Sequence, residues 1–376
     1  MQRIRIGMVG GGQGSFIGGV HRIAARLDDL FELKAGVLSS DAGRNRASAA
    51  EIGIAPERAY DTVAAMLAGE RGRSDAIEAV VVCTPNHLHH TAAKACLEAG
   101  LHVICDKPVT STLEDALDLK AAVARSGRVF VLTHNYTGYP MVRQMREMVA
   151  AGAIGALRLV QSEYAQDWLT EAQETKGAKG AEWRTDPARS GAGGSIGDIG
   201  THAYNLAAFV TGREPARLLA DLTSFVPGRR LDDNAAILLR YADGAKGMIW
   251  ASQVAVGNEN HNTLRVYGSK GGLEWEQENP NVLGFTPYGE PRRILTRAGP
   301  AATPGNLWGS RIPSGHPEGF LEAFANIYRA AAAAIRGEAD APAYPTIADG
   351  LRGLAFIDAC VRSNREGNVW VDLDAG

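Results

Sequence analysis

The chain has 376 residues, of which 45% are hydrophobic and 22% charged, so it is long enough for two globular domains. Its formal net charge of −3 argues against a protein that mainly binds nucleic acid or an anionic membrane. Its four cysteines lack metal-ligand spacing, and no run approaches about eighteen apolar residues, the length that spans a bilayer. We therefore expect a cytoplasmic protein with no disulfide framework, no nucleic-acid partner and no membrane segment.

The first part of the chain alternates apolar strands with helical patterns. Residues 78–84 are apolar on both faces and stop at Pro85, as in a strand covered on both sides. Repeated strand–helix–strand units of this kind predict a doubly wound parallel sheet with right-handed crossovers. The strands are predicted at 3–9, 31–38, 78–84, 101–105 and 128–133.

A glycine-rich loop, Gly10-Gly11-Gly12-Gln13-Gly14-Ser15, joins the first strand to the first helix. Glycine lets the backbone approach a pyrophosphate, and the helix N-terminus offers unpaired N–H groups. The loop is longer than the usual dinucleotide fingerprint, and a tight turn without a ligand would explain the same residues. The strand–loop–helix context favours a dinucleotide site.

The residues after the second strand bear on which dinucleotide binds. An acid there bonds the ribose 2′-hydroxyl of NAD, whereas a basic group accepts the 2′-phosphate of NADP. Ser39 and Ser40 stand there, with Asp41 just beyond. Ser39 can bond either form, Asp41 favours NAD, and Arg44 would favour NADP. We expect NAD, with NADP left open.

The strand at 101–105 ends in Asp106-Lys107-Pro108. Because proline has no N–H for the next ladder bond, the chain must leave the sheet at its carboxyl edge, where ligands bind in open α/β sheets. Lys107 could there hold a substrate hydroxyl or carry a proton. It could equally be a lysine that only takes the strand end into water.

The pattern changes after His134. A helix at 140–151 and a strand at 156–166 precede a Gly-, Lys- and Ser-rich stretch, 170–194, that we expect to form a loop over a cleft. After a helix at 196–211, successive strands without helices indicate an antiparallel sheet. These strands are predicted at 215–226, 233–241, 245–254, 262–268, 272–276 and 281–287, followed by a Pro- and Gly-rich loop at 287–318 and helices at 317–336 and 346–364.

Asp198 and His202 open the helix at 196–211 within Gly-Asp-Ile-Gly-Thr-His. Residues four apart share a helical face, and a carboxylate beside an imidazole fixes its tautomer and favours its protonation. That pair suits a base that takes a hydroxyl proton as a hydride leaves. A purely structural pair would have the same spacing.

Other polar residues have weaker signals. Tyr164, Gln166 and Trp168 end the 156–166 strand, and Trp183-Arg184 follow; aromatic faces stack on sugar rings, but ordinary packing explains them equally well. Arg229-Arg230 beside Asp232-Asp233 predict a surface turn with local charge pairing. The histidines 87, 89 and 90 lack a Cys or acid at ligand spacing, so we expect no metal site.

Four motifs, taken in chain order, resemble those of the Gfo/Idh/MocA family of sugar and cyclitol oxidoreductases. They are Gly10-Gly11-Gly12, Thr84-Pro85-Asn86 with His89, Gly100 to Pro108, and Gly197 to His202. The resemblance implies an N-terminal Rossmann domain, expected at 1–136. It also implies a C-terminal substrate-binding and oligomerisation domain at 137–376, with an open-faced, largely antiparallel sheet flanked by helices. The helix at 346–364 could pack back on the first domain. A homodimer or homotetramer is expected.

The resemblance also implies site residues. Lys107, Asp198 and His202 would be the catalytic set. The family usually has Glu at the position of Asp106 and often Arg at that of Tyr136, so both positions depart from its pattern. The substrate-binding residues would be Lys107, Tyr136, Gln166, Trp168, Trp183, Arg184, Asp198 and His202. The cofactor-binding residues would be Gly10, Gly12, Gln13, Gly14, Ser15, Phe16, Ile17, Ser39, Ser40, Arg44, Thr84, Pro85, Asn86, His89, Asp106, Lys107 and Asn135.

The expected function is an NAD(P)-dependent oxidoreductase that moves a hydride between nicotinamide and a secondary hydroxyl of a sugar, glycoside or cyclitol. An NAD-dependent glycosidase, which oxidises a sugar carbon transiently and eliminates the aglycone, is the alternative. A non-catalytic regulator of sugar metabolism on the same fold is a third, which the joint presence of Lys107, Asp198 and His202 disfavours.

Overall fold

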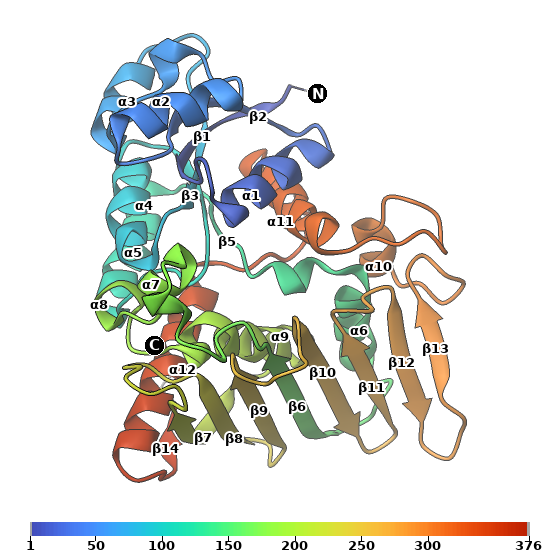
Figure 1. Cartoon of the computed structure of the whole chain (residues 1–376). Helices are drawn as coiled ribbons and strands as arrows, with labels where there is room; N and C mark the ends of the chain where they lie inside the picture. Colours follow the sequence, from blue (N-terminus) through green and yellow to red (C-terminus); the bar gives the residue numbers. More distant parts are fainter. Residues whose placement is uncertain (1, 374–376) are drawn as a thin grey trace. The chain divides into compact units, whose positions relative to one another are not determined.

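The computed structural model describes residues 2–373, apart from the side chain of residue 179, and divides into two compact units (Figure 1). One unit combines the chain up to Asn135 with Leu321–Gly350, and the other combines Tyr136–Phe320 with the chain from Leu351 onward. The expected domains, 1–136 and 137–376, stay a prediction, as does the docking of the helix at 346–364. By its contacts, the segment Leu321–Gly350 belongs with the N-terminal residues.

The first unit is built on a five-stranded parallel sheet in the order β2-β1-β3-β4-β5. This confirms the predicted doubly wound sheet. All five residues of the central strand β3 are buried, as its apolar sequence requires. The strands are β1 (Ile4–Gly10), β2 (Phe31–Val37), β3 (Ala79–Cys83), β4 (His102–Cys105) and β5 (Phe130–Leu132).

Side-chain caps explain where most helices of this unit begin. Ser15, Asp41, Thr62 and Thr112 each accept a hydrogen bond from a backbone N–H three residues ahead, which satisfies one of the unpaired donors of a helix N-terminus. The helix that starts after Thr62 is not among the predicted elements. The helices are α1 (Phe16–Leu27), α2 (Ala42–Glu51), α3 (Val63–Glu70), α4 (His89–Glu98) and α5 (Leu113–Ser126).

Helix α11 (Phe320–Ile335) completes the core of the first unit from far along the chain. The ring of its Tyr328 stands perpendicular to Phe31, with centroids 5.3 Å apart, and its hydroxyl lies 2.8 Å from Nδ1 of His21. Phe324 meets the edge of His21 at 5.4 Å. Phe324 and Tyr328 are almost fully buried. The α1 and β2 faces of the N-terminal chain are therefore covered by residues beyond 320.

The second unit contains a nine-stranded sheet in the order β13-β12-β11-β10-β6-β9-β8-β7-β14. Its neighbours pair antiparallel except β6 and β9, which run parallel, so the prediction of a largely antiparallel sheet is confirmed. The strands are β6 (Leu157–Ala165), β7 (Pro215–Thr223), β8 (Asn234–Tyr241), β9 (Lys246–Ser252), β10 (His261–Gly268), β11 (Gly271–Glu276), β12 (Val282–Pro287), β13 (Arg293–Thr296) and β14 (Val371–Asp372).

Helices α6 (Pro140–Ala150) and α9 (Thr201–Thr211) pack on one face of this sheet (Figure 1). Leu264 and Val266 of β10 are fully buried on that side. The other face of the sheet is open, because Leu159, Leu238 and Met248 are each about half exposed. Within the described residues, no helix combines the length and apolar character needed to cross a membrane.

Three expectations for the second unit need correction. The stretches 170–194 and 287–318 are not plain loops. The first contains α7 (Lys179–Arg184) and α8 (Pro187–Ser190), and the second contains β13 and α10 (Pro304–Gly309). Residues 229–233 are not a surface turn either, since the Arg229 side chain is 1% exposed and forms ion pairs with Glu174 and Asp233, each at 3.0 Å. Tertiary burial, which a local charge pattern does not reveal, decides this segment.

Candidate functional site

In the first unit, the glycine loop between β1 and α1 needs glycine at several positions, either for its backbone conformation or because a side chain would not fit. Gly10 and Gly11 have φ values of +86° and +74°. A Cβ at Gly18 would lie 2.3 Å from the carbonyl oxygen of Gly11, and one at Gly12 would lie 2.6 Å from that of Leu38. The loop therefore packs closely against both α1 and the end of β2. Two side chains bond to its backbone, since Arg22 Nη1 donates to Gly11 O at 2.6 Å and Ser48 Oγ accepts from Gln13 N at 3.0 Å. Gly18 fills the helix-packing role of the fingerprint's last glycine, which the longer loop concealed in the sequence.

The N-terminus of α1 begins directly after this loop. Ser15 Oγ accepts a hydrogen bond from Gly18 N at 3.1 Å, whereas Gln13 Nε2 donates to Glu51 at 2.8 Å. Gln13, Gly14 and Phe16 are exposed. The first turn of α1, including Ile17, thus presents its N-terminal end beside an accessible backbone loop, which is the arrangement that binds a pyrophosphate.

The polar residues after β2 organise the start of α2. Ser39 Oγ accepts from Asp41 N at 3.2 Å, and Asp41 Oδ1 accepts from Arg44 N at 2.7 Å. Ser40 and Arg44 are exposed. Asp41 therefore uses one carboxylate oxygen to cap α2, and the candidate ribose contacts Ser39, Ser40 and Arg44 are grouped at the carboxyl end of β2.

Two buried polar atoms at the carboxyl edge of this sheet lack a partner among the described residues. They are Oγ1 of Thr84, just after β3, and Nδ2 of Asn135, beyond β5. A buried donor or acceptor left unsatisfied costs about 1–3 kcal/mol, so both atoms point to a bound group that completes their hydrogen bonds. Together with the glycine loop, they fit a dinucleotide laid along this edge. Pro85 and Asn86 begin the next turn, and Asn86 is buried.

Lys107 follows β4 at the same edge and is half-buried. His89 joins the segment that contains Lys107 to the end of β3, because its Nδ1 lies 2.8 Å from the carbonyl oxygen of Pro108 and its Nε2 lies 2.8 Å from that of Thr84. Burial lowers the pKa of His89. The peptide bond between Lys107 and Pro108 is cis.

Asp106, next to Lys107, is an anion in this setting. Burial acts to raise its pKa, but the approach of His21, whose Nε2 lies 3.9 Å from Oδ1, and the charge of Lys107 outweigh burial and lower the pKa to about 2. Thr133 Oγ1 also donates to Oδ1 at 2.8 Å. The shortened acid is therefore fixed by its neighbours, and it keeps a negative charge beside the lysine.

In the second unit, Asp198 and His202 lie at the start of α9. Residues Ile196–Gly200 form a π-helical turn, a rare geometry that is frequent at functional sites. The carboxylate of Asp232 caps this turn by accepting from Gly194 N at 2.6 Å, Ser195 Oγ at 2.7 Å and Ile196 N at 2.8 Å. A residue predicted as part of a surface turn thus fixes the segment that holds the candidate catalytic pair.

Asp198 and His202 contact different neighbours. Asp198 Oδ2 accepts from Arg184 Nε at 3.1 Å and from Gln253 Nε2 at 2.9 Å. The His202 ring stands perpendicular to the Tyr136 ring, with centroids 4.8 Å apart. The interaction expected between Asp198 and His202 stays a prediction, because the spacing argument assumed an ordinary α-helical turn.

Arg184 brings several of the predicted substrate residues together. Its guanidinium lies 4.2 Å from the centre of the Trp183 ring and 5.9 Å from that of Trp168, and it donates to Asp198. Two aromatic faces and a charged pair therefore share one corner of the unit. Aromatic and cationic groups of this kind match the apolar faces and hydroxyls of a sugar.

A hydrogen-bonded chain next to His202 has a direction that chemistry fixes. The indole N–H of Trp168 can only donate, so the atom of Gln166 that it meets at 3.1 Å is the oxygen, and Gln166 Nε2 then donates to Asn260 Oδ1 at 2.8 Å. Tyr164 must also donate to that oxygen, at 2.8 Å. Its single proton is then committed, so Tyr136 donates to Tyr164 across 2.5 Å.

The end of this chain is the hydroxyl oxygen of Tyr136, whose only proton is used and whose remaining capacity is to accept. Tyr136 is 3% exposed and packs against His202. Burial raises the pKa of Tyr136, so the phenol stays neutral. The sequence suggests Tyr164 only as a ring that could stack on a sugar, and it does not point to Asn260, because a lone Asn in a turn gives no sequence signal.

Comparison with known proteins identifies the family. Residues 4–134 match an oxidoreductase family with an NAD-binding Rossmann fold, and residues 142–274 match the GFO/IDH/MocA C-terminal domain. The chain belongs to the Gfo/Idh/MocA family. Its first unit is an NAD-binding Rossmann fold, as the glycine loop and the unpartnered atoms of Thr84 and Asn135 also indicate.

Three relatives extend over the whole chain. A crystal structure of an oxidoreductase from Sinorhizobium meliloti is 55% identical, covers 99% of this chain and 100% of its own, and has a TM-score of 0.90. An inositol dehydrogenase homolog from Azotobacter vinelandii, complexed with NAD⁺, is 39% identical over 99% of this chain and 97% of its own, with a TM-score of 0.95. The levoglucosan dehydrogenase of Pseudarthrobacter phenanthrenivorans is 28% identical over 99% of each chain.

Proposed function

We propose that this Gfo/Idh/MocA oxidoreductase is an NAD-dependent dehydrogenase of a secondary hydroxyl on a sugar or cyclitol. The observation that carries the proposal is the hydrogen-bonded chain that ends on Tyr136 beside His202, because it leaves an acceptor oxygen next to an imidazole. A polyol supplies the hydroxyl donors that such an acceptor needs. Two relatives support this class of substrate, one described as an inositol dehydrogenase homolog and the other as a levoglucosan dehydrogenase.

In the proposed reaction the substrate loses a hydride from its carbinol carbon and a proton from its hydroxyl group. Bound NAD would supply the acceptor for the hydride that leaves the carbinol carbon. His202 takes the hydroxyl proton, so the carbon–oxygen bond becomes a carbonyl and no metal is needed to balance the step. Lys107 donates a hydrogen bond to the same oxygen and favours the loss of its proton.

Other residues of the second unit hold the substrate in the proposal. Asp198 is fixed through one oxygen by Arg184 and Gln253, which keeps its carboxylate in one orientation. Tyr136 accepts a hydrogen bond from a substrate hydroxyl, and the Trp168 and Trp183 faces pack on the ring. This set favours a ring with several hydroxyls over a simple alcohol, because only such a ring offers a hydroxyl to Tyr136 and an apolar face to the tryptophans at once.

The test is a panel of cyclitols, aldoses, anhydrosugars and p-nitrophenyl glycosides, with NADH formation and nitrophenol release followed in the same samples. We expect NADH in proportion to oxidised sugar, and Lys107→Ala to lower kcat by about 10²–10⁴-fold while NAD affinity changes little. Lys120→Ala removes an exposed lysine of α5, outside the proposed chemistry, and is the matched control. Nitrophenol release without net NADH formation would show that the protein is a glycosidase and not a dehydrogenase. A Lys107→Ala enzyme that keeps more than roughly a tenth of the wild-type activity would show that the lysine takes no part in the reaction.

A further inference from the structure

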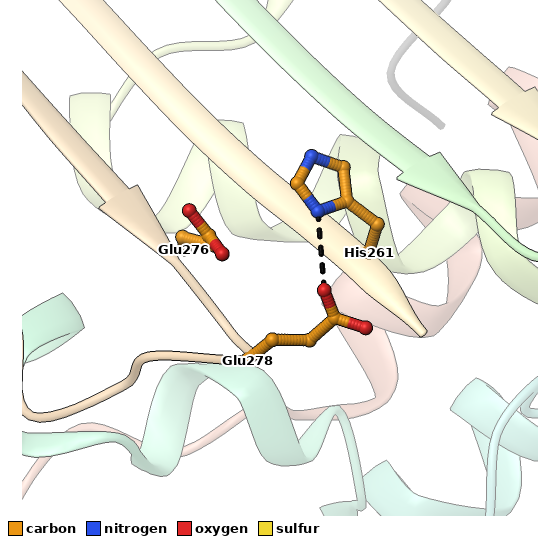
Figure 2. A group of neighbouring side chains, drawn as sticks. All are labelled: His261, Glu276 and Glu278. Atoms are coloured by element: carbon orange, nitrogen blue, oxygen red, sulfur yellow. Dashed lines mark hydrogen bonds and ion pairs between the residues drawn. The ribbon is translucent and has the colours of Figure 1, made fainter. Parts of the chain in front are cut away.

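We propose that His261, Glu276 and Glu278 of the second unit bind a divalent transition-metal cation such as Zn²⁺, a site separate from the proposed dehydrogenase chemistry. The sequence predicts no metal site, because these residues come together only through strand pairing. Figure 2 shows the three side chains converging, His261 from the start of β10 and the two glutamates from the end of β11 and the turn after it.

The pairing of β10 with β11 brings the three residues together. Thr263 lies opposite Glu276 in this antiparallel pair. Because side chains alternate along a strand, His261 shares the face of Thr263. Glu278 lies in the turn after β11, where Gln277 N still donates to Asn262 O of β10 at 2.9 Å. One ligand atom from each of the three side chains lies within 4.8 Å of the others.

The distances suit a small cation. His261 Nδ1 lies 3.3 Å from Glu278 Oε2 (Figure 2). Two ligands of a tetrahedral zinc, each about 2.0–2.2 Å from the metal, are about 3.4 Å apart. Glu276 is exposed, so a change of rotamer can bring its carboxylate in from the wider spacing. An imidazole nitrogen with carboxylate oxygens selects Zn²⁺ or Mn²⁺ over Mg²⁺ and Ca²⁺, which prefer oxygen alone.

The charges around the cluster favour a cation. On the same face, Glu163 pairs with Arg265 at 2.9 Å and Glu274 with Arg292 at 3.1 Å. Among the described residues, neither Glu276 nor Glu278 forms an ion pair with lysine or arginine within 4.0 Å. His261 is therefore the basic group that Glu278 contacts, at 3.3 Å, and the two carboxylates repel each other. A divalent cation bound between the three side chains offsets that repulsion.

Two further groups support the cluster in the way that metal ligands are usually supported. Glu278 Oε1 accepts a hydrogen bond from Asn260 N at 3.0 Å, which orients the carboxylate so that Oε2 faces His261. Thr263 is 3% exposed, and its Oγ1 is buried with no hydrogen-bond partner among the described residues. Its side chain is directly opposite Glu276 on the shared face. A carboxylate drawn inward by a cation would give that hydroxyl the acceptor that it lacks.

The test uses tag-free, full-length protein cleared of metals with a chelator and then titrated with Zn²⁺ in a calorimeter, with Co²⁺ visible absorption as the spectroscopic probe. The wild-type protein should bind one Zn²⁺. The Glu276→Gln and His261→Ala variants should each bind Zn²⁺ at least tenfold more weakly than wild type. Glu274→Gln removes the same charge from the same strand and face, so it is the matched control and should titrate like wild type.

Circular dichroism and the unfolding midpoint establish that each variant is folded before it is titrated. Zn²⁺ should raise the unfolding midpoint of wild type and of Glu274→Gln but not of Glu276→Gln, since a ligand that binds only the folded state stabilises it. Equal Zn²⁺ affinity in all four proteins would overturn the proposal. Equal competition by Mg²⁺ would also overturn it, because that result marks a diffuse negative surface rather than a nitrogen-containing site.

Discussion

The cap that Asp232 forms on the π-helical turn can be tested by Asp232→Ala. Three donors lose their acceptor, Gly194 N, Ser195 Oγ and Ile196 N, which now lie 2.6–2.8 Å from the carboxylate. All three residues are buried. An unsatisfied buried donor costs about 1–3 kcal/mol, and loss of an N-cap side chain costs about 0.5–2 kcal/mol. Because water can enter the vacated space, we expect a loss of about 3 kcal/mol rather than the full sum.

Tryptophan fluorescence during urea unfolding is the assay. The six tryptophans all belong to the second unit, so this signal reports the unfolding of the unit that contains the cap. With a urea dependence of about 2–3 kcal/mol/M, the midpoint should fall by about 1 M. Asp221→Ala, at an exposed carboxylate of β7, is the control and should stay within about 0.5 kcal/mol of wild type.

The outcome also separates stability from positioning. If the cap orients Asp198 and His202, the folded fraction of Asp232→Ala should show a lower kcat with unchanged NAD affinity. A midpoint shift corresponding to less than about 0.5 kcal/mol would refute the energetic reasoning. Full activity in protein shown to be folded would confine Asp232 to stability.

Two further predictions concern the two units separately. Asp106→Asn should lower stability at neutral pH by about 2 kcal/mol, from the difference between an ordinary pKa of 3.8 and about 2 in the folded chain. A lowered carboxyl pKa stabilises above the unfolded value, so this difference should shrink as pH falls from about 4 toward 2, measured by circular dichroism; a pH-independent difference would contradict it. Tyr164→Phe removes the partner of Tyr136 and of Asn260. It should lower kcat/KM for the sugar roughly tenfold and leave NAD affinity unchanged, and an equal loss of both would contradict the hydrogen-bonded chain.

The sequence predicts the first unit well because its signals are local. Apolar strands such as 78–84, the glycine loop and the strand end at Lys107 each follow from neighbouring residues, and the parallel sheet confirms the pattern. The role of Gly18 is not apparent from the sequence because the loop is longer than the usual fingerprint, so the close approach to Gly11 is visible only in three dimensions.

The second unit is harder to predict because its important contacts join distant residues. Arg229 and Asp232 have the local composition of a solvated turn, yet one is buried in an ion-pair cluster and the other caps a helix more than thirty residues earlier. A π-helical turn has no sequence pattern comparable with the 3.6-residue period. Asn260 and His261 acquire their neighbours only when β10 pairs with β6 and β11.

Helix α11 is synthesised long after the N-terminal strands that it covers, and this affects how the protein folds during translation. The N-terminal strands leave the ribosome early, but the rings that cover His21 and Phe31 belong to Phe324 and Tyr328. Until those residues are synthesised, the nascent Rossmann sheet exposes an apolar surface, the condition under which chains aggregate or bind chaperones. A fragment ending at residue 136 would keep that surface bare permanently. Expression of the NAD-binding unit alone would therefore require a polypeptide that joins the N-terminal segment directly to the α11 segment.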